Sequence, residues 1–305
     1  MKSYLTILLF LPLIVNAQLT MGSIFSNNMV LQQGKPICIY GKANPKQELV
    51  ISFAGETKST MVPSDSNWMV IFKKQPNSSN PKTLQVRCGS LQISFENILI
   101  GDIWLCIGQS NMEFPMSREL HYQEEKLNAD LPLIRFYNPV YPGKNTYNTA
   151  FSDSIVNKLN GNPIYEGHWQ ISDSFSLKNM SAVAYYFAKS IFTNTGTPIG
   201  LINLSIGGAP LETFISKQTL QHSEKFANKV AGNWITNESL PIWVRERGGQ
   251  NVGTVSTVKS DENGKNHMYK PSFAYSAGLA SLTQFPIKGI ICYQGESNAK
   301  ELDRV

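Results

Sequence analysis

Apolar and polar residues alternate in short runs over the first part of the chain. From residue 18 to about residue 98, turns rich in Gly, Pro, Asn and Ser separate these runs, one of them at residues 77–81. Short alternating runs at this spacing are typical of a small all-β, sandwich-like domain. Trp68 is expected in its core, because a single Trp in an alternating strand usually packs there; a sugar-binding platform is the alternative. The expected strands are residues 29–32, 37–40, 49–53, 68–72, 83–87 and 91–95.

The rhythm changes from residue 99 onward. Apolar runs of strand length alternate with longer segments of helical periodicity, which is typical of a parallel sheet with crossover helices. One helix is expected to face the core with Val183, Phe187 and Ile191, and the polar residues 138–166 are expected to form a loop. The expected strands are residues 103–107, 133–137, 198–205 and 286–293, and the expected helices are residues 117–129, 181–192, 213–222 and part of 267–285.

A serine follows the first strand of this second part. The apolar run ends at Gly108, where the chain can turn sharply because Gly tolerates positive φ. Ser110 lies two residues after Gly108, shortly before a charge-rich helical segment. Ligands bind beyond the carboxyl ends of strands in open α/β sheets, and N–H groups at a helix start stabilise developing negative charge. Ser110 is therefore a candidate nucleophile, and a polar turn is the plainer interpretation.

Two other strands end in comparable groups. Gly207 and Gly208 follow the run at 198–205, and paired glycines let a backbone N–H approach a ligand without a side chain in the way. Amide and carboxylate side chains at residues 294–298 follow the run at 286–293, and such groups can bind sugar hydroxyls or an oxyanion. Taken singly, each group is also compatible with a turn or a helix cap.

The first residues have the pattern of a secretory leader. Lys2 gives a positive start, residues 5–15 form an apolar stretch too short to span a membrane, and residues 15–17 offer a cleavage site. We therefore expect residues 1–17 to be a signal peptide, with a mature chain that starts near Gln18 and is exported, either periplasmic or secreted. No cysteine follows the apolar stretch, so no lipid anchor is expected, and no later segment is expected to span a membrane.

Composition and charge exclude a nucleic-acid partner. Of the 305 residues, 42% are hydrophobic and 16% are charged, which provides enough apolar mass for a core. The formal net charge is +5, but the positive residues are scattered, and the basic group at residues 245–247 is expected to belong to a solvated surface loop. This pattern is not the clustered footprint that nucleic-acid binding requires.

The cysteines indicate neither zinc nor a disulfide framework. Cys38, Cys88, Cys106 and Cys292 match no zinc-binding spacing. Cys106 and Cys292 lie in apolar runs and are expected to pack as small hydrophobic residues. Cys38 and Cys88 could oxidise in an exported protein, but a bridge needs Cα atoms within about 7 Å, so free thiols are favoured.

Together, the three strand-end groups resemble three motifs of the sialate O-acetylesterases, a family of SGNH-type hydrolases. Residues 286–289 and 27–32 also resemble that family, and the similarity extends from about residue 24 to residue 300. The motifs are residues 108–113 (Gly-Gln-Ser-Asn-Met-Glu), 205–212 (Ser-Ile-Gly-Gly-Ala-Pro-Leu-Glu) and 293–299 (Tyr-Gln-Gly-Glu-Ser-Asn-Ala).

The resemblance implies a fold and an activity. The fold would be α/β, a three-layer α/β/α SGNH hydrolase with a flavodoxin-like parallel sheet at residues 99–305, preceded by an N-terminal β domain at residues 18–98. The activity would be removal of O-acetyl groups from sialic acids or related acetylated glycans, without a metal or an organic cofactor.

The resemblance also assigns roles to residues. Ser110 would be the nucleophile, Gly208 would supply an oxyanion-hole N–H that Gly207 allows to approach, and Gln294 would complete the hole, with the N–H of Ser110 as a further donor. A hydroxyl to attack the acetyl carbonyl, and donors to meet the oxygen that becomes negative, fit this chemistry. Substrate contacts without an assigned chemical role would come from Asn111, Glu296 and Asn298.

The chain departs from the family pattern at its end. The family has its catalytic Asp and His in an Asp-x-x-His block downstream of the third motif, whereas this sequence stops at Val305. None of the four histidines (His121, His168, His222 and His267) lies in such a context, so none is expected to be the base. We interpret the sequence as a piece of a longer, active esterase; a chain that ends here and has weak or no activity is the alternative.

Two other functions fit the same residues. An acetylxylan-type esterase acting on plant polysaccharide would use the same nucleophile and oxyanion hole. A non-catalytic glycan-binding protein would use the same cleft without the reaction.

Overall fold

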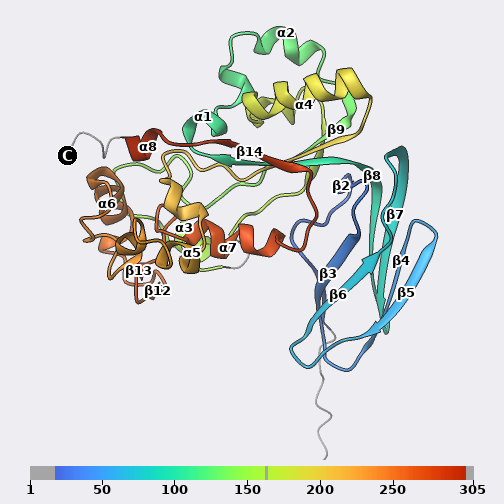
Figure 1. Ribbon diagram of the computed structural model, residues 1–305, viewed down its shortest axis with the longest axis horizontal. Helices are drawn as coiled ribbons and strands as arrows, with labels where there is room; N and C mark the ends of the chain where they lie inside the picture. Colours follow the sequence, from blue (N-terminus) through green and yellow to red (C-terminus); the bar gives the residue numbers. More distant parts are fainter. Residues whose placement is uncertain (1–17, 162–163, 300–305) are drawn as a thin grey trace, which may run out of the picture.

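One long strand, β8 (Leu91–Gly108), runs through both parts of the chain (Figure 1). Its first half pairs with the antiparallel strand β7, and its second half pairs with the parallel strands β11 and β14. The boundary expected between residues 98 and 99 falls inside this strand. The backbone therefore passes from the N-terminal β region into the central sheet without a linker.

The computed structural model describes residues 18–161 and 164–299. The predicted signal peptide at residues 1–17 lies outside the described residues, and its assignment stays a prediction. The strands are β1 (Leu19–Met21), β2 (Val30–Gln32), β3 (Ile37–Ala43), β4 (Glu48–Phe53), β5 (Glu56–Met61), β6 (Asn67–Phe72), β7 (Ser78–Cys88), β8, β9 (Leu131–Tyr137), β10 (Trp169–Ser172), β11 (Ile199–Asn203), β12 (Ser260–Asp261), β13 (Gly264–Lys265) and β14 (Gly289–Tyr293).

Helices alternate with the strands in the second part of the chain. The α-helices are α1 (Ser110–Glu113), α2 (Tyr122–Leu127), α3 (Asp153–Leu159), α4 (Ala182–Thr195), α5 (Lys217–Gln221), α6 (Ile242–Gly248), α7 (Phe273–Ala277) and α8 (Glu296–Ala299). Single turns of other helix types are η1 (Met116–Arg118), η2 (Leu177–Asn179), η3 (Leu211–Phe214), η4 (Ala227–Val230), η5 (Gly249–Gly253) and η6 (Leu279–Leu282).

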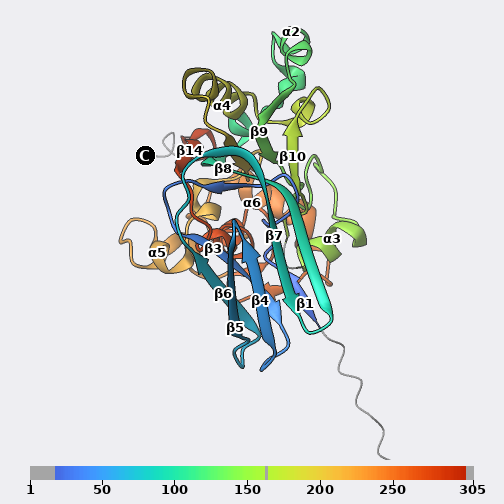
Figure 2. The same ribbon diagram turned by 90° about the vertical axis from the view of Figure 1, so that its right-hand side faces the viewer.

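The N-terminal β region consists of two sheets that share one core (Figure 2). One sheet has the order β1-β3-β6, and the other contains β4, β5, β7 and the first half of β8. Phe53 of β4 meets Phe72 of β6 edge to face, with 5.9 Å between the ring centroids. Trp68 is buried in this core, as expected, and is no exposed sugar platform. The turn expected at 77–81 is wrong, because the polar start of β7 pairs irregularly with β8 at Ile100 and Ile98.

The central sheet has the order β10-β9-β11-β8-β14. All its strand pairs are parallel except β10 with β9. If the three strands that carry the motifs (β8, β11 and β14) are numbered in chain order, they lie as 2-1-3. The strand order therefore reverses on either side of β8, and such a switch point is where open α/β sheets bind ligands.

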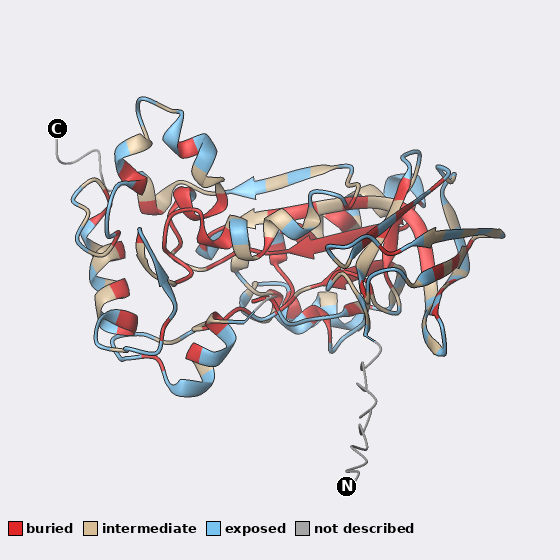
Figure 3. Cartoon of the chain, turned by 90° about the horizontal axis from the view of Figure 1, so that it is seen from below, coloured by how far each residue is buried: buried red, intermediate tan, exposed pale blue. Residues whose placement is uncertain are grey.

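Helices cover both faces of this sheet (Figure 1). Helix α4 packs on one face, in a core that it shares with Phe136 of β9 and Leu201 of β11. Helices α3 and α7 lie on the other face, in the large core that continues into the N-terminal β region. Figure 3 shows the buried positions concentrated along the strands between these layers.

Helix α4 meets the expected stripe only in part. Ile191 packs against the core and Phe187 meets Trp104 edge to face, whereas Val183 is 37% exposed. The fully buried residues are Ala182, Ala184, Tyr185 and Ala188. The inner face of α4 therefore consists of three alanines and the fully buried Tyr185. The Ser181 side chain caps the start of the helix by accepting a hydrogen bond from the N–H of Ala184.

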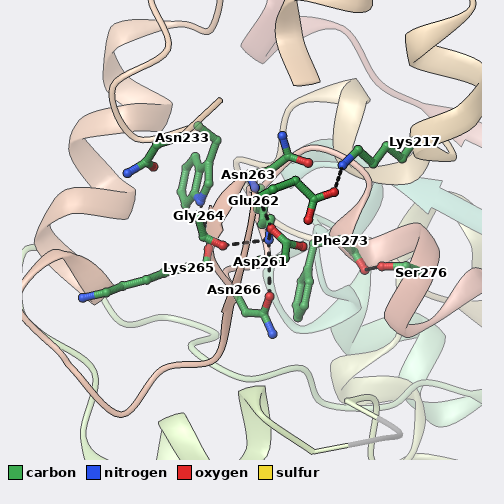
Figure 4. Close-up of polar contacts among 12 residues, drawn as sticks. Lys217, Asn233, Asp261, Glu262, Asn263, Gly264, Lys265, Asn266, Phe273 and Ser276 are labelled. Atoms are coloured by element: carbon green, nitrogen blue, oxygen red, sulfur yellow. Dashed lines mark hydrogen bonds and ion pairs between the residues drawn. The ribbon is translucent and has the colours of Figure 1, made fainter. Parts of the chain in front are cut away.

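Two segments expected as loops contain regular structure. The segment at 138–166 carries α3, and the group at 245–247 lies on α6 instead of in a surface loop. The β12–β13 hairpin follows α6 and η5 along the chain, and Figure 4 shows the polar contacts around it. The buried Lys270 donates to Asp261 Oδ1 at 2.6 Å and to the carbonyl of Gly264 at 2.8 Å, while Lys217 pairs with Glu262. Ion pairs and hydrogen bonds to the backbone stabilise this segment. Such contacts produce no periodic pattern of apolar residues in the sequence.

The cysteines are free thiols. Cys38 lies on β3 and Cys88 on β7, in different sheets, and the Cys88 thiol donates to Gln47 Oε1. Cys106 is buried as expected, whereas Cys292 is exposed on β14, which corrects its expected core position. Across the described ranges, no helix has the length and apolarity that crossing a membrane requires.

Gln32 joins the N-terminal region to the central sheet. Strand β2 pairs with β8 as far as Gly101, and β14 pairs with β8 from Trp104 onward. Between these two stretches, the buried side chain of Gln32 makes the hydrogen bonds to β8. Its Oε1 accepts from the N–H of Ile103 at 2.9 Å, and its Nε2 donates to Asp102 Oδ1 at 2.9 Å. The neighbouring Gln33 also donates to Asp102 Oδ1, at 3.0 Å, but its side chain is partly exposed.

Replacing Gln32 by Leu is expected to lower the free energy of unfolding by about 1–3 kcal/mol, because a buried N–H would lose its acceptor. Urea denaturation measures this change. Gln33→Leu is the matched control, and it should cost less than about 1 kcal/mol because water can replace the lost bond. Equal effects of the two substitutions would contradict the junction role of Gln32.

Candidate active site

Ser110 lies just beyond the carboxyl end of β8. Gly108 has φ +142°, and a Cβ there would lie 2.1 Å from the carbonyl oxygen of Tyr293, so only Gly fits. The N–H of Gln109 donates to that same carbonyl at 3.2 Å. Ser110 then opens α1 with an exposed side chain, and N–H groups in a first helical turn have no partner within the helix.

The two glycines after β11 form a tight turn beside Ser110. The N–H of Ile206 donates to the carbonyl of Gly108 at 2.9 Å, and the N–H of Ala209 closes the turn onto the carbonyl of Ile206 at 3.0 Å. Gly208 has φ +78°, as the third residue of a type II turn requires. A Cβ at Gly208 would lie 2.5 Å from the hydroxyl of Tyr269, so a side chain is excluded on steric grounds too.

Two tyrosines hold this turn from opposite sides. The Tyr141 hydroxyl accepts from the N–H of Gly207 at 3.2 Å, and the Tyr269 hydroxyl donates to the carbonyl of Gly207 at 2.7 Å. In a trans peptide the C=O and the following N–H point in opposite directions. The bond from Tyr269 therefore fixes the direction of the Gly208 N–H, which has no hydrogen-bond acceptor within residues 18–161 and 164–299.

Ser110, Gly207 and Gly208 line the same cleft, which has a volume of about 870 Å³. Asn111 and Glu113 of α1 also line it. Tyr147, Trp243 and Tyr269, for which the sequence predicted no role, also line it, and so does Arg247, which was expected in a solvated surface loop. The structure thus brings together the expected nucleophile and the expected glycine donors, which lie about a hundred residues apart in the sequence.

Gln294 lies behind the Ser110 turn and does not line the cleft. Its Nε2 donates to the carbonyl of Ala209 at 3.0 Å and to Gln109 Oε1 at 3.3 Å. Its Oε1 is buried without a partner among the described residues. In this arrangement Gln294 connects all three motifs. Its Nε2 could donate to an oxyanion only after giving up its hydrogen bond to Ala209 or to Gln109.

The other residues of the third motif also bridge between motifs. Asn298 donates to both carboxylate oxygens of the buried Glu212 at 3.0 Å and accepts from the N–H of Leu211 at 2.9 Å. Glu296 accepts a hydrogen bond from the Asn111 side chain. Of the three residues expected to contact substrate, only Asn111 lines the cleft.

Glu113 is a functional candidate for which the sequence analysis assigned no role. It accepts from the Tyr141 hydroxyl at 3.1 Å and pairs with Lys144 Nζ at 2.8 Å. Burial and the neighbouring Glu113 carboxylate raise the pKa of Tyr141 well above its usual value, so its hydroxyl remains protonated. Glu113 ends the first motif, and that position was the signal available in the sequence.

No histidine lines the cleft among the described residues. His267 is buried between the rings of Phe151 and Trp234. Its Nδ1 accepts from the N–H of Tyr269 at 3.0 Å, so this ring nitrogen is occupied in positioning Tyr269. Burial lowers the pKa of His267 to about 3, which keeps the ring neutral near pH 7.

Sequence comparison finds relatives with one described activity. No protein-family model matches the chain. The human sialate O-acetylesterase is 26% identical over 310 aligned positions, which cover 95% of this chain and 52% of the human protein. The mouse sialate O-acetylesterase is 25% identical, covering 91% of this chain and 52% of the mouse protein. The chain thus spans about half the length of the curated relatives it matches.

Structural comparison gives a consistent result for the fold. The crystal structure of a carbohydrate acetylesterase from Xanthomonas citri aligns with a TM-score of 0.65 at 22% sequence identity, over 92% of this chain and 52% of that chain. The α/β fold class is therefore confirmed. The resemblance that the three strand-end motifs predict is confirmed as well: this chain is similar to the sialate O-acetylesterases over nearly its whole length.

Proposed function

We propose that this chain carries the nucleophile and the oxyanion hole of a serine esterase that removes O-acetyl groups from sialic acids or related glycans. The observation that carries the proposal is that Ser110 and Gly208 open onto one cleft from two neighbouring parallel strands. An SGNH-type architecture fits the 2-1-3 order of the motif strands and the helices on both faces of the sheet. Export fits the leader pattern of residues 1–17, and the N-terminal residue of the mature protein tests it.

In the proposed reaction, Ser110 Oγ attacks the acetyl carbonyl carbon while its proton passes to a general base. The carbonyl oxygen becomes negative and accepts hydrogen bonds from the N–H groups of Gly208 and Ser110. The intermediate collapses, and the sugar oxygen leaves with the proton from the base. Water then attacks the acetyl-serine by the same steps and releases acetate. The family resemblance assigns the role of the base to the His of an Asp-x-x-His block.

The polar contacts behind the cleft support the positions of these groups. Gln109 and Gln294 connect the turn before Ser110 to the turn that contains Gly208, and Asn298 connects the third motif to Glu212 of the second. We assign these side chains a positioning role. Oxyanion-hole donors act through preorganisation, since they need no reorientation when charge develops.

Ser110→Ala in the full-length protein should abolish release of acetate from O-acetylated sialic acid, leaving at most a residual rate of about 10³–10⁴ over water. Ser117, which also lines the cleft, provides the matched control Ser117→Ala, which should keep most of the activity.

Acetylated xylan as a second substrate separates a sialate esterase from an acetylxylan-type esterase. A serine-directed phosphonate that fails to label Ser110, in a protein that still binds the glycan, would instead indicate a non-catalytic binder.

Tyr269→Phe should lower kcat by about 10- to 10³-fold with little change in KM, because the Gly207–Gly208 peptide could rotate and turn its N–H away from the oxyanion. Steady-state kinetics measure the two constants separately. Tyr185→Phe removes another buried hydroxyl, on α4 and outside the cleft, and should leave both constants unchanged. A rise in KM at unchanged kcat for Tyr269→Phe would assign Tyr269 to substrate binding instead.

A further inference from the structure

Positive charge predominates on the wall of the cleft. Within the described part of the chain, its lining contains three cationic side chains (Arg118, Lys144 and Arg247) and a single carboxylate, Glu113. Lys144 and Glu113 neutralise each other, with 2.8 Å between Nζ and Oε1. Among the described residues, neither Arg118 nor Arg247 has an acidic partner. Two guanidinium groups in this cleft are therefore available to an anion.

Arg247 is the better placed of the two. Its guanidinium lies over the ring of Tyr147, with 4.7 Å to the ring centroid, and its side chain is partly buried. Arg118 is exposed. A planar guanidinium that is stacked on a ring loses less conformational freedom when it binds a second group. The positive charge of Arg247 also acts on its surroundings, because it contributes to the lowered pKa of His267.

Helix α6 places Arg247 close to the proposed oxyanion hole. Residues four apart on a helix lie on the same face, so Arg247 and Trp243 are neighbours. The Trp243 ring lies 3.5 Å from the position that a Cβ on Gly208 would occupy. Trp243 thus lies beside Gly208, and Arg247 lines the same cleft. Arg247, Tyr147 and His267 also line a second, small cavity of about 20 Å³, which is large enough for one water.

We propose that Arg247, with Tyr147 and Trp243, forms a subsite for a carboxylate on the sugar that carries the acetyl group. The subsite makes the protein select acidic O-acetylated glycans over neutral ones. This inference rests on the proposed function and deepens it. A guanidinium fits a carboxylate through two parallel hydrogen bonds, and the flat face of Trp243 fits a sugar ring held between the carboxylate and the acetyl group.

The chemistry of the subsite is a carboxylate next to a sugar ring, which sialic acids and uronic acids both provide. Binding of each acid distinguishes the two sources. N-acetylneuraminic acid and glucuronic acid, each with its neutral carboxamide, are titrated calorimetrically into Ser110→Ala protein and into the Ser110→Ala/Arg247→Gln double variant. The first protein should bind at least one acid about 10- to 100-fold more tightly than its amide, as expected for hydrogen bonds to a charged group.

In the Ser110→Ala/Arg247→Gln variant, the ratio of acid affinity to amide affinity should fall toward one. Ser110→Ala/Arg118→Gln is the matched control, since it removes the same charge from the same cleft, and it should keep most of the ratio. Equal losses in both double variants would indicate unspecific attraction by net charge and would overturn the subsite. Equal binding of acid and amide by the Ser110→Ala protein would overturn it too.

Acetate release by the protein with Ser110 intact separates this proposal from the proposed function. Selective binding of the acid that depends on Arg247, together with no acetate release from any substrate, would support the subsite and refute the esterase. Acetate release at equal kcat/KM from an O-acetylated acid and its carboxamide would support the esterase and refute the subsite.

Discussion

Hydrogen bonds across the carboxyl ends of β8, β11 and β14 are the constraint on which the candidate site depends. The carbonyl of Gly108 accepts from Ile206, and the carbonyl of Tyr293 accepts from Gln109. These bonds fix the turn before Ser110 between the turns that follow the two neighbouring strands. Because Gly108 has no side chain, β14 can approach it closely enough for this arrangement. A longer residue there would separate the strands at the point where the motifs meet.

A second layer of contacts determines which way the backbone groups point. A turn with Gly at two central positions can rotate its middle peptide at little steric cost, because Gly accepts both signs of φ. Tyr141 and Tyr269 hold the two ends of Gly207, and Glu113 in turn accepts from Tyr141. The glycines thus provide access to the cleft, and the tyrosines provide the direction. His267 supports this layer from behind by accepting from the N–H of Tyr269.

The electrostatics of the cleft follow from how far each charge is neutralised. Glu113 and Lys144 form a pair whose net charge is zero, so their contribution is mainly to position Tyr141. Arg247 has no acidic partner among the described residues, and its position on α6 directs it along the same wall as Trp243. The N-terminal β region contributes no residue to this wall and instead supports β8 through its own core and through Gln32.

The sequence by itself predicted the parallel strands β8, β9, β11 and β14, their alternation with helices, and the position of Ser110, Gly207 and Gly208 at strand ends, but it missed the strands β1, β5 and β10. These features are local. The periodicity of apolar residues indicates which side chains are buried, and Gly indicates where the backbone can adopt a positive φ. Only the tertiary structure decided which of the motif residues face the cleft. It places Asn298 and Gln294 between the motifs, and it brings Tyr141, Tyr269 and Arg247 to the site from segments without a clear period. Contacts between residues distant in the chain leave no local pattern, so a polar segment that folds around buried ion pairs and aromatic rings has the same appearance in a sequence as a solvated loop.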